Sequence, residues 1–246
     1  MSNLKGRHKP CITAHAGCMN TIPNSRESLI AAFNSGADIV EVDIRASKDR
    51  VVVLAHDESI WSSRNGKAKV GDLSWEEIER RSSSAGTALL RLENFLEIAE
   101  KFNHETMLNL DIKDSSALST AAAIIKARGI SASVIFSGLD TEGIRMAREK
   151  LPGLAYFFNA DELMPLSGAT REDMGKTCAL ASEQGCSGIN LEWTRASREF
   201  VDFAQSRGLL VMLWTVDDEE SMRTALKYRP NSVTTNYPDL LARLMM

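Results

Sequence analysis

Residues 107–136 read MLNLDIKDSSALSTAAAIIKARGISASVIF, and this stretch contains the pattern that decides the fold. Met107–Ile112 is a short run with strand character, and Ser115–Arg128 is an alanine-rich run with helical character. Gly129 follows this run where a C-terminal cap belongs, and Ser133–Phe136 is again typical of a strand. The order of strand, helix and strand predicts two parallel strands joined by a helical crossover.

The same alternation continues on both sides of this stretch. Further strands are predicted over Cys11–Ala14, Asp38–Ile44, Leu154–Phe158, Ser187–Leu191, Leu209–Thr215 and Ser232–Thr235. Helices are predicted over Arg26–Ser35, Thr141–Lys150, Arg171–Gln184, Ser197–Arg207, Asp218–Lys227 and Asp239–Leu244, and Gly185 and Gly208 lie just past two of them. Eight parallel strands close a ring, so the predicted fold is α/β, a TIM-type (β/α)8 barrel. A Rossmann-like open sheet is the alternative, but no Gly-rich phosphate fingerprint follows the first strand.

One strand-like run, Val51–His56, does not fit the ring. Only Ala46–Arg50 separates it from the strand that ends at Ile44, whereas a parallel crossover needs a dozen or more residues. We therefore interpret it as an extra β-hairpin arm, which brings His56 back beside Glu41. The region that follows, residues 57–106, is irregular, with helical patterns over Trp75–Arg81 and Leu92–Phe102. A connection of this length predicts a cap or binding loop.

Length and composition predict one globular domain, the barrel over residues 1–246. Apolar residues make up 43% and charged residues 25% of the 246 residues. The net charge is −4 without a basic block, which argues against nucleic acid or an anionic membrane surface as a partner. Met1–Pro10 has no signal-peptide pattern, no run is long enough to span a membrane, and the four cysteines stand singly. We expect a cytoplasmic protein with reduced thiols; the sequence leaves open whether it forms a homo-oligomer.

Polar residues gather where the first three predicted barrel strands end, which is where active sites of such barrels lie. His15 follows the first strand, Glu41 and Asp43 end the second, and Asp111 and Lys113 end the third. The i, i+2 spacing within each pair places both side chains on one face of its strand. Any one of these residues has an ordinary structural explanation, but their convergence predicts a site.

Three converging carboxylates repel one another and are driven to take up protons. A divalent cation removes this difficulty, and all-oxygen ligands favour Mg²⁺ or Ca²⁺ over zinc. Two histidines at the same rim can remove and deliver protons near neutral pH, and Lys113 offers a positive charge to an anion. Trp214, at the end of the penultimate strand, is either a wall of the substrate pocket or a core aromatic.

A series of short motifs along nearly the whole chain resembles that of the glycerophosphodiester phosphodiesterases, within the superfamily of phospholipase C-like phosphodiesterases. The motifs are His15-Ala16-Gly17, Asn24-Ser25, Gly36-Ala37-Asp38, Glu41-Val42-Asp43, Ser47-Lys48-Asp49, His56-Asp57, Asp111-Ile112-Lys113, Trp214-Thr215-Val216 and Thr234-Thr235-Asn236-Tyr237-Pro238. The resemblance implies hydrolysis of a glycerophosphodiester to glycerol 3-phosphate and an alcohol, with one divalent cation, Mg²⁺ or Ca²⁺.

The resemblance also implies roles for single residues. His15 and His56 take the general acid and base positions, Glu41, Asp43 and Asp111 take the metal positions, and Lys113 lies near the phosphate. The partner is then a small-molecule phosphodiester.

Several positions depart from the family pattern. Ala16 replaces an arginine that usually follows the first histidine, and Pro23 replaces an acidic residue. Ser62 stands where the family often has an arginine, with Arg64 nearby as a substitute for contact with the phosphate. Asp111 replaces a glutamate, and Asn236 replaces an aspartate. These changes affect the expected substrate more than the expected chemistry.

Three other functions remain open from the sequence. The chain is a phosphodiesterase for another sugar- or lipid-linked diester, a barrel that binds a phosphodiester with impaired turnover, or a metal-free sugar-phosphate isomerase. The cluster of carboxylates argues against the isomerase, because that reaction needs one base and no group of acids.

Overall fold

Parallel strands close into a ring in the computed structural model of the protein, which describes residue 4 and residues 9–62, 66–84, 88–102 and 105–246. In chain order the strands are β1 (Cys11–Ala14), β2 (Ile39–Ala46), β6 (Met107–Ile112), β7 (Val134–Leu139), β8 (Ala155–Asn159), β9 (Gly188–Glu192), β10 (Leu210–Trp214) and β11 (Ser232–Thr235). Each pairs in parallel with its neighbours, and β1 pairs with both β11 and β2, which closes the ring. The predicted TIM-type (β/α)8 barrel is therefore confirmed.

The side chains inside the barrel change from apolar to polar along the strands. At the amino ends they form a buried apolar layer of Leu4, Cys11, Ile39, Met107, Ile135, Phe157, Leu210 and Met212. Side chains two and four residues after Ile39 and Met107 point the same way, because a strand alternates its faces. These positions carry Glu41, Asp43, Asn109 and Asp111, all buried. The fold therefore places a polar layer at the carboxyl ends of the strands.

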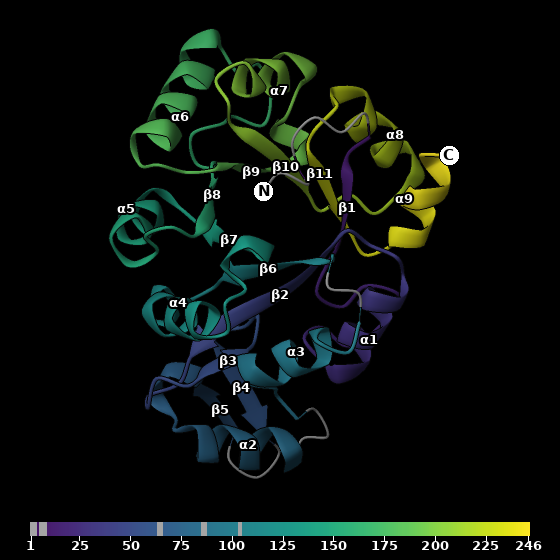
Figure 1. The fold of residues 1–246 in the computed structure, drawn as a ribbon. Coiled ribbons are helices and arrows are strands. Elements are labelled where there is room, and N and C mark those ends of the chain that lie inside the picture. Colours follow the sequence, from purple (N-terminus) through teal and green to yellow (C-terminus); the bar gives the residue numbers. More distant parts are fainter. Residues whose placement is uncertain (1–3, 5–8, 63–65, 85–87, 103–104) are drawn as a thin grey trace.

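The helices lie outside the ring of strands (Figure 1). They are α1 (Arg26–Asn34), α3 (Leu92–Ala99), α4 (Leu118–Ala127), α5 (Thr141–Lys150), α6 (Arg171–Glu183), α7 (Arg198–Gln205), α8 (Glu219–Tyr228) and α9 (Pro238–Leu244). Short 3₁₀ turns occur at η3 (Ser115–Ala117), η4 (Ser131–Ser133) and η5 (Trp193–Arg195). Gly129, Gly185 and Gly208 end helices with positive φ, as predicted. The outward side chains of the strands pack against these helices in the main hydrophobic core.

The predicted hairpin arm is also present. Strand β3 (Val52–Leu54) runs antiparallel to β2, with Leu54 opposite Ile44. The turn that joins them is held by the Ser47 hydroxyl, which accepts the Val51 N–H at 2.9 Å and donates to Asp49 Oδ1. Only Arg50 in this turn has a positive φ, of 66°.

The region predicted as an irregular cap contains regular elements. These are an antiparallel pair, β4 (Ser59–Ser62) and β5 (Gly66–Lys69), then η2 (Val70–Asp72) and helix α2 (Trp75–Ser84). They pack on β3 through a small core that includes Val53, Val70 and Ile78, and they project from one side of the barrel (Figure 1). The β4–β5 pair escaped prediction because β5 is mostly exposed and polar, so no apolar alternation marks it.

Two further expectations concern cysteines and membranes. Cys11, Cys18, Cys178 and Cys186 are all buried, and no disulfide bond joins any two of them. Within the described part of the chain, none of the helices combines the length and the apolar character needed to cross a bilayer.

Candidate active site

Three carboxylates meet at the carboxyl ends of β2 and β6. The parallel register sets Glu41 beside Asn109 and Asp43 beside Asp111. One carboxylate oxygen from each of Glu41, Asp43 and Asp111 lies within 4.8 Å of the others. All three residues are buried, with 6%, 2% and 8% of their surface exposed. The three residues predicted as metal ligands are thus brought together.

Burial makes this cluster electrostatically unfavourable on its own. The pKa of Glu41 is raised from 4.5 to about 8, chiefly by burial, with Asp111 and Asp43 adding to the rise and His15 and Lys113 opposing it. Burial also raises the pKa of Asp111. The Lys113 ammonium lies 3.0 Å from Asp111 Oδ2 and 3.2 Å from Asp43 Oδ1. Burial lowers the pKa of Lys113, but these carboxylates outweigh it and raise the pKa above its usual value.

The cluster fits a divalent cation. Three carboxylates and one ammonium leave two negative charges when all are ionised, which one divalent ion neutralises. Among the described residues, Asp43 Oδ1 and Asp111 Oδ1 are buried oxygens that accept no hydrogen bond, although Asp43 Oδ1 has the ionic contact with Lys113. Buried carboxylate oxygens without donors are stable only if another positive group contacts them. Hard oxygen donors of this kind suit Mg²⁺ or Ca²⁺.

Neighbouring residues fix two of these carboxylates. Asn24 lies in the left-handed region at φ 61°. Its amide donates to Asp43 Oδ2 at 2.8 Å and accepts the Asp43 N–H at 3.0 Å. Gly138 fits against Asp111, because a Cβ at position 138 would lie 1.9 Å from Asp111 Oδ1. The Asn24-Ser25 motif pointed to the first of these residues, whereas nothing in the sequence distinguishes Gly138 from other glycines.

His15 lies at the edge of the carboxylate cluster. Its Nε2 is 3.9 Å from Glu41 Oε1, and its Nδ1 is 2.9 Å from Asn236 Oδ1. Burial lowers the pKa of His15, but Glu41, the hydrogen bond to Asn236 and the charges of Asp43 and Asp217 together raise it above its ordinary value. The ring is therefore placed to exchange protons next to the cluster.

His56 is placed differently from His15. Its backbone is anchored to the rim, because the N–H of the preceding Ala55 donates to the Asp43 carbonyl at 3.0 Å. Its side chain is 61% exposed and its Nδ1 lies 2.9 Å from Asp57 Oδ1. Arg45 donates to the His56 carbonyl through Nε and a terminal nitrogen, at 3.0 and 2.8 Å. In the described part of the chain no hydrogen bond or ion pair joins His56 to the three carboxylates.

The remaining predicted site residues have mixed outcomes. Trp214 ends β10 and is half-buried, and its Nε1 is a buried donor with no partner among the described residues. Arg64 lies outside the described residues. Ala16, at the position of the missing arginine, is buried with 4% of its surface exposed. A larger side chain at position 16 therefore has to displace neighbouring atoms.

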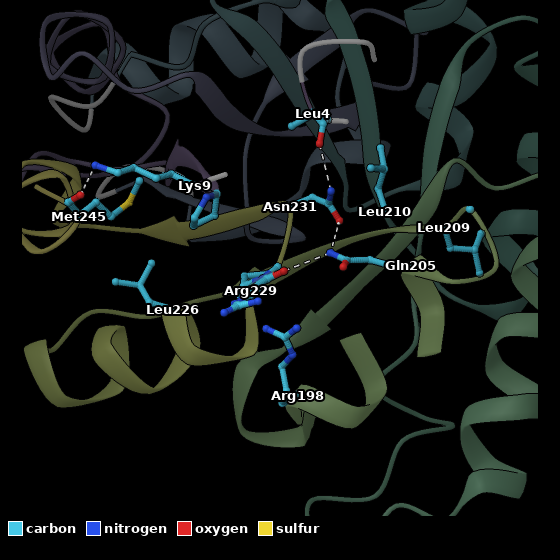
Figure 2. A pocket seen from close by; sticks show the side chains of 13 residues that line it. Leu4, Lys9, Arg198, Gln205, Leu209, Leu210, Leu226, Arg229, Asn231 and Met245 are labelled. Carbon is cyan, nitrogen blue, oxygen red and sulfur yellow. Dashed lines mark hydrogen bonds between the residues drawn. The ribbon is translucent and has the colours of Figure 1, made fainter. Parts of the chain in front are cut away.

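A cavity of about 840 Å³ opens at the other end of the barrel (Figure 2). Its walls come from the segments before β1, β10 and β11 and from helices α7 and α8, and they include Lys9, Arg198, Arg229 and Asn231. Gln205 binds the Arg229 carbonyl and Asn231 there. None of the predicted site residues that the structure describes lines this cavity. The predicted metal ligands and His15 lie together at the carboxyl-end rim instead.

Comparison with known proteins agrees with this geometry. The sequence profile of the glycerophosphoryl diester phosphodiesterase family matches residues 15–240. The chain is 24% identical over 255 residues to the glycerophosphodiester phosphodiesterase of Caldanaerobacter subterraneus subsp. tengcongensis, which covers 96% of this chain and 98% of that relative.

Two solved structures have the same fold. A glycerophosphodiester phosphodiesterase from Thermotoga maritima is 22% identical with a TM-score of 0.75, and the alignment covers 97% of this chain and 99% of that one. A phosphodiesterase from Oleispira antarctica, in complex with the product sn-glycerol-3-phosphate, is 18% identical with a TM-score of 0.77 and covers 96% and 97% of the two chains.

Proposed function

The chain belongs to the glycerophosphoryl diester phosphodiesterase family and is a phosphoric diester hydrolase, and on this premise we propose that it hydrolyses a glycerophosphodiester to glycerol 3-phosphate and an alcohol, with one divalent cation. The observation that carries the proposal is the buried cluster of Glu41, Asp43 and Asp111, with His15 at its edge. A buried group of acids beside a histidine has no structural advantage, but it suits the cleavage of an anionic ester.

In this proposal Glu41, Asp43 and Asp111 hold the ion, Mg²⁺ or Ca²⁺. When bound, the ion neutralises charge on the phosphate and on the attacking oxygen. Asp43 and Asp111 hold the Lys113 ammonium beside the carboxylate cluster, where it binds a phosphoryl oxygen. Asn24 keeps the Asp43 carboxylate in one orientation. The chain thereby binds and orients the diester.

Proton transfer falls to the two histidines. His15 exchanges a proton through Nε2, the nitrogen on the side of Glu41. His56 takes the second transfer at the solvent side of the site, from the backbone position that the Ala55–Asp43 hydrogen bond fixes. Its exposed side chain has room to turn toward a bound diester. Trp214 supplies a wall for the glycerol or the alcohol.

The experiment that tests the proposal is a ³¹P NMR assay of glycerophosphocholine. The protein is stripped with a chelator and then given Mg²⁺, Ca²⁺ or neither. We expect the diester signal to convert to that of glycerol 3-phosphate only when a divalent ion is present. Asp43→Asn should require more metal for the same rate. Asp239→Asn, which removes a surface aspartate paired with Arg243, serves as the matched control.

The assay also separates the alternatives. Phosphocholine as the product would mean that the other ester bond is cleaved and would contradict the proposal. Turnover only of larger sugar- or lipid-linked diesters would assign another substrate. Binding of the diester without any phosphomonoester would identify a binding barrel.

A further inference from the structure

A hydrogen-bonded series at the ends of neighbouring strands runs from Asp217 through Asn236 to His15. Strand β11 lies between β1 and β10, and its Thr235 is opposite Ala14 of β1. His15 follows β1, Asn236 follows β11, and Asp217 comes three residues after the end of β10. In the sequence, Asn236 belongs to a motif of the family and departs from its usual aspartate, whereas no pattern marks Asp217.

The carboxylate of Asp217 accepts hydrogen bonds from both the main chain and the side chain of Asn236. Its Oδ1 accepts the Asn236 main-chain N–H at 2.8 Å and the Thr235 hydroxyl at 3.3 Å. Its Oδ2 accepts the side-chain amide of Asn236, from Nδ2, at 2.8 Å. The other end of this amide, Oδ1, lies 2.9 Å from Nδ1 of His15.

Donors and acceptors leave one arrangement for this series. An ionised carboxylate offers only acceptors, so the amide must turn its NH₂ toward Asp217 and its oxygen toward His15. An amide oxygen only accepts, so Nδ1 of His15 must carry the proton. The neutral ring then has its lone pair on Nε2, on the side of Glu41.

We propose that Asp217, acting through Asn236, is a positioning residue that holds His15 in the Nδ1–H tautomer and so makes Nε2 the nitrogen that exchanges the proton of the reaction. The catalytic consequence rests on the proposed function, whereas the tautomer rests on the hydrogen bonds alone. In the step, Nε2 takes the proton of the attacking hydroxyl while Nδ1 keeps its own proton and its bond to Asn236. No proton passes to the amide or to Asp217.

Asp217→Asn should reverse the direction of the hydrogen bonds from position 217 to His15. The new amide has to keep its oxygen on the Asn236 main-chain N–H, because that donor cannot turn around. Its NH₂ then faces the NH₂ of Asn236, and two donors oppose each other. Rotation of the Asn236 amide relieves this conflict but turns its NH₂ toward His15. The ring then has to accept at Nδ1 and carry its proton on Nε2.

The double exchange Asp217→Asn with Asn236→Asp should restore the original tautomer. The amide introduced at position 217 again keeps its oxygen on the main-chain N–H and donates its NH₂ to the new carboxylate at position 236. The second oxygen of that carboxylate accepts from Nδ1 of His15. Recovery in the double variant distinguishes a positioning role from simple loss of stability, because the composition of the pair is unchanged.

The test is ¹⁵N NMR of the full chain labelled at histidine, loaded with Mg²⁺, at a pH where the rings are neutral. His15→Gln assigns the signals of His15, and Asp239→Asn is the matched control. We expect Nδ1 to be the protonated nitrogen in the wild type, Nε2 in Asp217→Asn, and Nδ1 again in the double variant. On the diester, kcat should fall roughly 10²–10⁴-fold in Asp217→Asn with little change in KM, and should largely recover in the double variant.

A wild-type His15 protonated on Nε2 overturns the inference, as does Asp217→Asn with unchanged tautomer and kcat. If Asp217→Asn does not fold, the spectra of the wild type and of the double variant test the tautomer of His15. A His15 ring protonated on Nε2 in either protein overturns the inference. If the wild type hydrolyses no diester, the proposed function fails, while the spectra still settle the tautomer.

Discussion

Replacement of Glu41 by Gln should stabilise the protein without metal and destabilise it relative to the wild type with metal. Gln has nearly the same shape as Glu but carries no charge to bury. Without an ion, the Glu41 carboxylate stands among other acids with its pKa raised from 4.5 to about 8. With an ion, the same carboxylate is a ligand that Gln replaces poorly.

The raised pKa determines the dependence on pH. The folded, metal-free protein binds the Glu41 proton more tightly than the unfolded chain does. The stability from that proton is fully present below pH 4.5 and is lost as the pH rises through about 8. For a single group this loss is on the order of 4–5 kcal/mol. The Glu41→Gln variant avoids the loss. Because relaxation of the metal-free site and entry of water reduce that loss, we expect a net gain of roughly 1–3 kcal/mol at pH 9.

The assay is thermal unfolding at pH 5 and pH 9, in chelator and in saturating Mg²⁺ or Ca²⁺. For a chain of this size, 1 kcal/mol shifts Tm by roughly 2–4 °C, so Glu41→Gln in chelator at pH 9 should melt about 2–12 °C above the wild type. At pH 5 this advantage should be small. Metal at about 1,000 times its Kd should stabilise the wild type by about 4.1 kcal/mol, which exceeds the expected advantage of the variant and reverses the order of the two proteins.

Glu192→Gln is the control, because Glu192 also ends a barrel strand but binds Arg195, at 3.0 Å, and lies outside the carboxylate cluster. It should respond to metal as the wild type does. A Glu41→Gln variant that is less stable than the wild type in chelator at pH 9 would contradict this prediction. A wild-type Tm that metal leaves unchanged would contradict it equally.

Three further predictions address single residues. His15→Gln and His56→Gln should each lower kcat roughly 10²–10⁴-fold with unchanged circular dichroism; near-full activity of either would remove that histidine from the proposed mechanism. Asn24→Ala should weaken metal affinity roughly 10–100-fold by calorimetry, because Asp43 loses its amide donor; unchanged affinity would contradict this role. Gly138→Ala should destabilise the fold by roughly 2–3 kcal/mol or more in urea, because φ is +72° and its Cβ would lie 2.6 Å from the Ile112 carbonyl oxygen; wild-type stability would contradict the close approach.

The barrel and its carboxylate cluster were predictable because both depend on local patterns. Apolar strand-like runs that alternate with helical patterns predict a parallel sheet whose strands are buried on both faces. Within them, Glu41 and Asp43 interrupt an apolar run two residues apart, and Asp111 does so in the next barrel strand. Parallel register then brings the carboxyl ends of adjacent strands together, as the pairing of Asp43 with Asp111 confirms.

The rest depends on contacts that the sequence does not encode locally. Asp217 and Asn236 are distant in sequence from His15, and only the closure of the ring sets them next to it. Gly138 matters because a bulge in β7 brings its backbone against Asp111. The exposure of the His56 side chain and its contact with Asp57 are likewise features that no pattern predicts.

The apolar and the polar layer inside the barrel have different roles: the first stabilises the fold, and the second carries the residues of the candidate site. Side chains such as Ile39, Met107 and Phe157 fill the amino end and are buried in apolar surroundings, so they contribute hydrophobic stabilisation. One or two strand repeats further on, β2 and β6 carry the acids Glu41, Asp43 and Asp111, which repel one another when no ion is present. Because the same strands carry both layers, the apolar layer holds the backbone rigid where the acids must converge. The unfavourable cluster persists in the fold because the apolar packing opposes its separation, and a cation held by the three acids would relieve their repulsion.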